Sequence, residues 1–242
     1  MSEDENLELL MPQVPVVEIE RKFDVADETV IPPLHDVPGI GHVDEPVEHQ
    51  LRAEYYDTQD LRLAARRITL RRRTGGEDAG WHLKLPAGPE ERHEYHEPLG
   101  KKANGVPEAL LQLVRVHTRN TALIPVARLR TRRIVHRLRH RNGEVVADFT
   151  DDQVQADTFI SEQATQHWRE WEVELVDGPR ELLDAVQDLI AVAGVRPAQH
   201  GSKLARALGT ALPTTPGQAP APSPAGPAGR VLHCRFFTAI CE

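Results

Sequence analysis

The sequence has few cysteines, few aromatic residues and no long apolar run, and these shortages exclude whole classes of protein. Only Cys234 and Cys241 occur in 242 residues, which excludes a disulfide framework and leaves no ligand spacing for a structural zinc site. No apolar run approaches the roughly 20 residues that cross a bilayer. The first residues are acidic where a signal peptide is basic. We therefore expect a cytoplasmic protein with no membrane partner.

Positive charge is also scarce, but it is concentrated. The 29 Lys and Arg residues are outnumbered by 37 Asp and Glu, which gives a net charge of −8 and argues against a general nucleic-acid binder. Thirteen of the 29 basic residues nevertheless fall within 62–73 and 128–141. An acidic chain that gathers arginine in two segments is expected to hold an anionic ligand there.

Composition divides the chain into four parts. Residues 1–13 carry charge without a hydrophobic period and are predicted to be a disordered acidic leader, ahead of a folded domain over 14–208. Residues 209–229 contain six prolines and no charged residue, which is typical of an extended linker. Residues 230–242 form a short tail whose role is open.

Hydrophobic patterning within 14–208 favours an α+β fold. Helices are expected at 107–115, 179–194 and 202–208, where Pro107, Pro179 and Ser202 supply start signals. The Asn142-Gly143 pair predicts a hairpin turn. Strand-like segments, bounded by Gly, Pro or Asp, occupy 16–24, 52–57, 67–74, 80–86, 92–98, 126–139, 144–150 and 168–176.

The polar faces of these strands carry full charges of both signs. Alternation places Glu18, Glu20 and Lys22 on one face of the first strand, and it places Glu172 and Glu174 with Glu170 on one face of the last. The three tryptophans are expected to pack on the outside. Eight strands with one apolar and one charged face fit an eight-stranded antiparallel β-barrel with a charged interior and helices packed outside.

A charged interior of this kind suits a metal and a phosphate chain. Carboxylate oxygens are the ligands that Mg²⁺ and Mn²⁺ prefer, and Arg and Lys side chains bind phosphate oxygens. A single Glu-x-Glu pair on a strand is usually a solvated face. Two such pairs, together with two arginine-rich strands, favour a metal-phosphate site.

The motifs that carry this chemistry occur in a fixed order. The first is Glu18-Ile19-Glu20-Arg21-Lys22, an ExExK pattern. Those that follow are Tyr55-Tyr56-Asp57-Thr58, Leu70-Arg71-Arg72-Arg73, Trp81-His82-Leu83-Lys84, Arg92-His93-Glu94, the basic strand at Arg133, the acidic strand end from Asp148 to Asp152, Glu172-Val173-Glu174 and Ser202-Lys203. With this series, residues 14–208 resemble the CYTH superfamily, also called triphosphate tunnel metalloenzymes, whose signature is ExExK.

The resemblance implies a tunnel that binds a linear triphosphate with a divalent metal, Mg²⁺ or Mn²⁺. The implied metal ligands are Glu18, Glu20, Asp152, Glu172 and Glu174. The implied phosphate ligands are Lys22, Arg71, Arg73, Lys84, Arg133 and Lys203, and Arg92 and Glu94 would support the cavity wall. Glu18, Glu20, Lys22, Glu172 and Glu174 would form the catalytic set, with one metal at Glu18 and Glu20 and a second near Glu172, Glu174 and Asp152.

Strand parity separates the three aspartates of the acidic strand end without choosing among them. Asp148 and Asp152 are four residues apart and face one way, whereas Asp151 faces the other. Parity also places Arg133 with Thr131, on the face that Arg130 and Arg132 do not share.

The function implied is metal-dependent hydrolysis of a triphosphate, with inorganic triphosphate as the first choice. Thiamine triphosphatase and class IV-type adenylyl cyclase are alternatives, because they share the phosphate site and differ in the organic end of the substrate. A non-catalytic polyphosphate-binding module is a third alternative. Many relatives continue into a helical CHAD domain, for which residues 209–242 are expected to leave no room. Metal preference and oligomeric state stay open.

Overall fold

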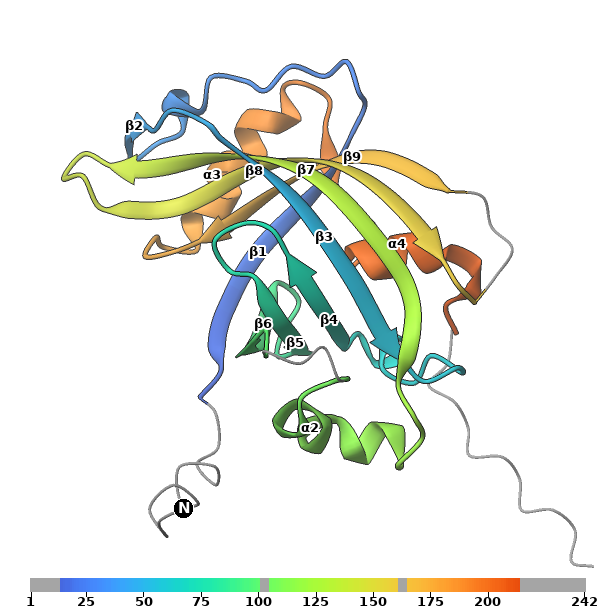
Figure 1. Ribbon diagram of the computed structural model, residues 1–242. Coiled ribbons are helices and arrows are strands. Elements are labelled where there is room, and N and C mark those ends of the chain that lie inside the picture. Colours follow the sequence, from blue (N-terminus) through green and yellow to red (C-terminus); the bar gives the residue numbers. More distant parts are fainter. Residues whose placement is uncertain (1–13, 101–104, 161–164, 214–242) are drawn as a thin grey trace, which may run out of the picture.

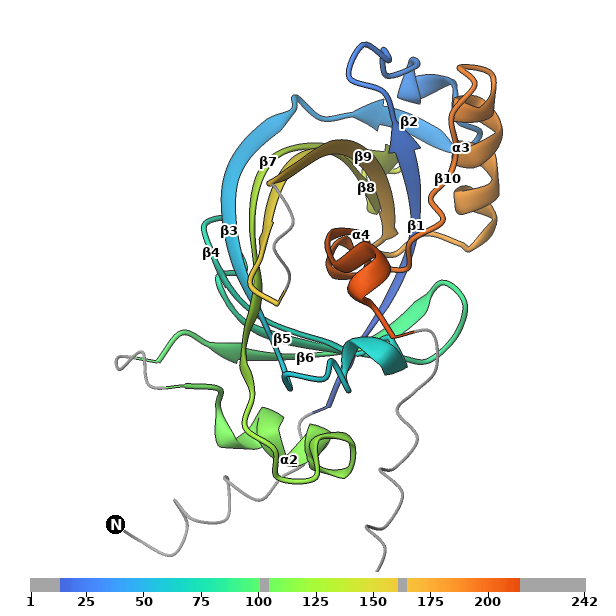
Figure 2. The same ribbon diagram turned by 90° about the vertical axis from the view of Figure 1, so that its right-hand side faces the viewer.

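The computed structural model describes residues 14–100, 105–160 and 165–213, and a closed barrel of eight antiparallel strands forms its centre (Figures 1 and 2). Around the barrel the strands follow the order β1-β6-β5-β4-β3-β7-β8-β9, and pairing of β9 with β1 closes the ring. The strands are β1 (Val16–Val25), β3 (Val47–Asp57), β4 (Thr69–Thr74), β5 (Gly80–Pro86), β6 (Glu91–Pro98), β7 (Ile124–His140), β8 (Val145–Thr158) and β9 (Gln166–Leu175).

All eight predicted strands are present, and two short ones were not predicted. β2 (Ile40–Val43) pairs with the far end of β7, and β10 (Arg196–Pro197) pairs with β1. Neither is long enough to show a period of two. The Asn142-Gly143 turn joins β7 to β8 as predicted, with Gly143 at a φ of 90°, a conformation that favours glycine. The predicted leader, most of the linker and the tail lie outside the described residues.

Two of the helices lie outside the barrel, as predicted. α2 (Glu108–Thr118) packs Leu110 and Val114 against outward-facing residues of β4 and β5, including Trp81. α3 (Glu181–Ala191) covers the outer face of β1 and β9, where Trp171 is fully buried. In the part of the chain that the structure describes, these helices of 11 residues are the longest, and none has the length and apolar character to span a membrane.

The third helix fills one end of the barrel from within. Figure 2 shows α4 (Lys203–Leu208) inside the ring of strands. Its Leu204, Ala207 and Leu208 pack against inward-facing residues such as Leu129 and Trp168. Trp168 therefore faces inward, against the expectation, because it shares the face of Glu170 on β9. The barrel interior is apolar beside α4 and charged beyond it.

A buried aspartate organises the turn that leads from β3 to β4. The Asp57 carboxylate accepts hydrogen bonds from the backbone N–H groups of Thr58, Leu63 and Ala64, at 2.7, 2.9 and 2.8 Å. Leu63 and Ala64 in turn carry apolar side chains into two of the cores. The Tyr55–Thr58 motif thus fixes where β4, with its arginines, begins.

We expect Asp57→Ala to lower the free energy of unfolding by about 3 kcal/mol or more, because three buried N–H donors lose a charged acceptor. Urea denaturation followed by circular dichroism measures the change. Asp60→Ala is the matched control, since this neighbouring side chain is largely exposed, and it should cost less than about 0.5 kcal/mol. Equal stabilities of the two variants would contradict the role given to Asp57.

Candidate active site

The charged part of the interior is a small cavity into which β1, β4, β5, β6, β7 and β9 direct alternate side chains. Its volume is about 90 Å³, and seven basic and six acidic side chains line it. The lining includes every predicted site residue except Asp152, which lies directly behind Arg133. Register explains the convergence, because β1 and β9 pair with Glu20 opposite Glu174 and Lys22 opposite Glu172.

Three carboxylates of this cavity form a group that is only partly neutralised. Lys84 contacts Glu18, and Lys22 and Arg92 contact Glu20, whereas no ion pair within the described residues reaches Glu174. Glu18, Glu20 and Glu174 can bring oxygen atoms within 4.8 Å of one another. Burial and the neighbouring Glu18 and Glu20 raise the pKa of Glu174 to about 7. One oxygen of Glu18, Oε2, is buried without a hydrogen-bond partner. Carboxylates gathered at this spacing fit a divalent cation, which would remove their mutual repulsion.

A second group of carboxylates already holds its counter-ion. Asp152, Glu170 and Glu172 also lie within 4.8 Å of one another, and Lys203 Nζ contacts them at 2.8, 2.6 and 2.8 Å. Burial alone would raise the pKa of Glu172, but Lys203, Lys22 and Arg133 hold it well below its usual value. The expected grouping differs here, because Glu172 and Glu174 belong to different acid groups.

The three aspartates of β8 have separate places. Asp152 is fully buried and accepts two hydrogen bonds from Arg133, at 2.8 and 2.6 Å. Asp151 faces outward and binds Arg169, whereas Asp148 faces the open end of the barrel and binds Arg137. Of the three, only Asp152 joins a buried acid group.

The basic side chains that line the cavity beside the acids are here called the cradle: Lys22, Arg71, Arg73, Lys84 and Arg133. Arg71 and Arg73 lie side by side on β4, and the Nε atom of each is buried without a hydrogen-bond partner. Burial, Arg71 and Arg133 lower the pKa of Arg73 to about 9, so it remains charged at neutral pH in a strongly positive field. Lys84 contacts Glu18, and Lys22 donates a hydrogen bond of 2.7 Å to Glu172. The Nη atoms have partners, since Arg73 pairs with Asp78 and Arg71 Nη1 lies 3.5 Å from the Tyr55 hydroxyl. The two buried Nε donors without acceptors fit an anion.

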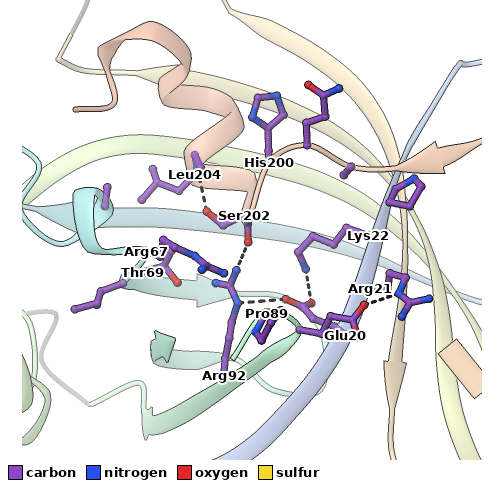
Figure 3. Close-up of a pocket in the computed structure, with 18 of the residues that line it drawn as sticks. Glu20, Arg21, Lys22, Arg67, Thr69, Pro89, Arg92, His200, Ser202 and Leu204 are labelled. Atoms are coloured by element: carbon purple, nitrogen blue, oxygen red, sulfur yellow. Dashed lines mark hydrogen bonds and ion pairs between the residues drawn. The ribbon is translucent and has the colours of Figure 1, made fainter. Parts of the chain in front are cut away.

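The site opens into a larger cavity of about 660 Å³, here called the vestibule (Figure 3). The two cavities share Glu20, Lys22, Thr69, Arg92 and Ser202. Arg92 Nε lies 3.6 Å from Glu20 Oε1, and its Nη2 donates to the Gly201 carbonyl. None of the described residues that line the vestibule is Phe, Tyr or Trp.

Sequence reasoning left two contributors out of the site. Alternation along β9 placed Glu170 on the face of Glu172 and Glu174, but the implied site residues did not include it. No sequence pattern predicted the vestibule, because turns and connections supply about half of its lining.

Comparison with known proteins identifies the family. A family model described as the CYTH domain matches residues 17–208. The chain belongs to the CYTH family. Two uncharacterized Mycobacterium tuberculosis proteins, from strains CDC 1551 / Oshkosh and H37Rv, are each 44% identical over 217 residues, which is 84% of this chain. The chain spans only 42% of the length of these relatives.

A solved structure of TM-score above 0.5 shows the same fold. An adenylate cyclase-like protein from Bacillus halodurans is 17% identical, with a TM-score of 0.55 over 80% of this chain and 98% of that one. An adenylyl cyclase-like protein from Hippeastrum, described as having a dominant triphosphatase activity, has a TM-score of 0.41 and 14% identity over 78% of this chain and 93% of that one. CYTH proteins bind triphosphates in such a tunnel with the help of a divalent metal.

We expect Lys203→Met to lower the free energy of unfolding by about 3 to 5 kcal/mol at pH 7, because three buried carboxylates lose their shared cation. Without Lys203 the pKa values of these carboxylates rise, so protonation at pH 5 relieves part of the penalty. The deficit relative to wild type should therefore shrink as the pH falls from 7 to 5.

Denaturation curves at both pH values measure this difference. Arg128→Met is the control, and its smaller deficit should not follow this pH dependence because Arg128 pairs with the partly exposed Glu54, away from the second acid group. A Lys203→Met deficit that is constant or grows at pH 5 would contradict the account of the second acid group.

Proposed function

We propose that this protein hydrolyses a terminal phosphoanhydride bond of a triphosphate in a metal-dependent reaction, and that inorganic triphosphate is its substrate. The observation that carries the proposal is the juxtaposition, in one cavity, of three gathered carboxylates and two arginines with unsatisfied atoms. Glu18 Oε2 and the Nε atoms of Arg71 and Arg73 are buried without a hydrogen-bond partner. A metal-triphosphate complex supplies both missing partners at once.

Binding would exchange one set of ion pairs for another. In the structure Lys84 pairs with Glu18, and Lys22 pairs with Glu20 and Glu172. Phosphate oxygens would draw the lysines away, and Glu18, Glu20 and Glu174 would then be free to hold a metal ion.

The side chains of the cradle would stabilise the charge that develops during the reaction. Arg71, Arg73, Lys84 and Arg133 would neutralise the phosphate oxygens and hold the chain in line. A bound Mg²⁺ or Mn²⁺ would supply further neutralisation and acidify a bound water. Ser202 lines the cavity, but its hydroxyl accepts a hydrogen bond from the Ala205 N–H as the cap of α4. Direct attack by water therefore fits better than a serine nucleophile.

The alternatives differ at the end of the substrate that lies beyond the phosphates. A nucleotide or thiamine triphosphate would place its ring system in the vestibule, where no Phe, Tyr or Trp of the described residues offers a stacking surface. Trp81 is packed under α2 and does not reach the site. A non-catalytic polyphosphate module would not need the carboxylates of Glu18, Glu20 and Glu174 gathered for a metal ion, so these residues favour catalysis.

We expect Glu20→Gln and Lys84→Ala each to lower kcat/KM for inorganic triphosphate by about 100-fold or more, because each removes a charge that the transition state requires. Phosphate release with saturating Mg²⁺ measures this loss. Arg128→Ala is the control, because Arg128 pairs with Glu54 on the outer face of the barrel, and it should retain wild-type activity. Near wild-type turnover by either site variant would defeat the proposal.

A substrate panel separates the alternatives. Wild-type protein should release phosphate from inorganic triphosphate faster than from ATP or thiamine triphosphate, and it should form no cyclic AMP with Mg²⁺ or Mn²⁺. Cyclic AMP as the main product would establish the cyclase instead. Tight triphosphate binding without turnover, unchanged in Glu18→Gln, would establish the binding module.

We expect Glu174→Gln to weaken Mn²⁺ binding about tenfold or more, because it removes one of three carboxylate ligands. Electron paramagnetic resonance of free Mn²⁺ measures the affinity. Glu170→Gln is the matched variant from the second acid group and should leave the affinity unchanged, because Lys203 already serves that group. If Glu170→Gln weakened Mn²⁺ binding and Glu174→Gln did not, the metal site would instead be Asp152, Glu170 and Glu172.

A further inference from the structure

His82 is a buried histidine beside the cradle, and both of its ring nitrogens face hydrogen-bond acceptors. It lies on β5 with 2% of its surface exposed. Its Nδ1 is 2.8 Å from Glu94 Oε1, and its Nε2 is 2.9 Å from the backbone carbonyl oxygen of Asp78. A carbonyl can only accept, and a neutral imidazole has one N–H. Both contacts can be hydrogen bonds together only when the His82–Glu94 pair holds one additional proton.

The charges around the pair oppose that proton. Burial, together with Arg71 and Arg73, lowers the pKa of His82 to about 4, although the Glu94 carboxylate pulls in the other direction. Arg71 lies directly opposite His82 in the strand register. The charged and titratable groups that face the pair are Arg71 and Arg73 on β4, Asp78 in the β4–β5 turn, Lys84 on β5 and His96 on β6.

We propose that the His82–Glu94 pair takes up a proton from solvent when a phosphate chain fills the cradle and returns it when the cradle empties. This inference rests on the proposed function, because it requires an anion beside Arg71 and Arg73. The negative charge of the anion offsets the two guanidinium groups, which are the neighbours that oppose the proton. The ring already lies between its two acceptors, so protonation needs no rearrangement.

The pair also connects to the cradle through Lys84, whose Nζ lies 3.9 Å from Glu94 Oε1. When His82 is protonated, its N–H holds one oxygen of Glu94, and the carboxylate stays directed toward Lys84. His82 is thus a positioning residue. Because proton uptake and binding are linked, triphosphate should bind more tightly as the pH falls. Its affinity should rise by up to about tenfold per pH unit in the pH range where binding takes up one full proton.

Calorimetric titration with inorganic tripolyphosphate in EDTA, which prevents turnover, tests this proposal. Titrations at pH 6.5 in buffers of different ionisation enthalpy give the number of protons exchanged on binding. Because the ligand itself titrates in this range, the result is a comparison of variants. Wild type should take up about one proton more than His82→Gln. His96→Gln is the matched control, since the exposed His96 ring lies beside His82 with ring centroids 4.8 Å apart, and it should behave like wild type.

Nitrogen NMR of the wild-type protein gives a second measurement that does not depend on how the buried variant folds. On addition of tripolyphosphate at pH 6.5, both ring nitrogens of His82 should shift to protonated values. Binding without this shift, or equal proton exchange in wild type and His82→Gln, overturns the inference and leaves the proposed function standing. Failure of wild type to bind tripolyphosphate overturns both.

Discussion

Charge neutralisation inside a closed barrel is the constraint on which the rest of this structure depends. Seven basic and six acidic side chains line one small cavity, and an unpaired charge there would cost several kcal/mol. The protein meets the cost with internal pairs such as Arg133 with Asp152 and Lys203 with its three carboxylates. Within the described part of the cavity, Glu18 Oε2 and the Nε atoms of Arg71 and Arg73 are left without a hydrogen-bond partner, and the pKa of Glu174 is raised to about 7. Stability and ligand specificity thus come from the same set of charges.

Much of the barrel could be predicted because alternation is a local property. Successive side chains of a strand point to opposite faces, so Glu18, Glu20 and Lys22 face inward while Val17 and Ile19 face outward. The eight strands were predicted from such patterns. β2 and β10 were too short to show a period. β8 was predicted to end near 150 but continues to Thr158, because its polar residues Gln153 and Gln155 face solvent while Val154 and Ala156 are buried.

The grouping of the site residues could not be predicted, because it depends on register between strands distant in sequence. Alternation places Glu172 and Glu174 on one face, but pairing with β1 sets Glu174 beside Glu20 and Glu172 beside Lys22. The position of α4 could not be predicted either. Its sequence indicates a short amphipathic helix but does not say what the apolar face packs against. The helix lies inside because apolar side chains line one end of the barrel. Lys203 reaches the acids because Leu204, Ala207 and Leu208 anchor the helix there.

The pairing of β1 with β9 has a consequence for how the chain assembles. These strands are separated by about 150 residues, and together they complete the ring. Contacts between segments so distant in sequence form late and slowly during folding. The acid group at Glu18, Glu20 and Glu174 lies across this seam, so a cation held there would staple the first strand to the last. Such a staple slows the opening of the seam, and it gives an occupied protein a longer lifetime against unfolding than an empty one.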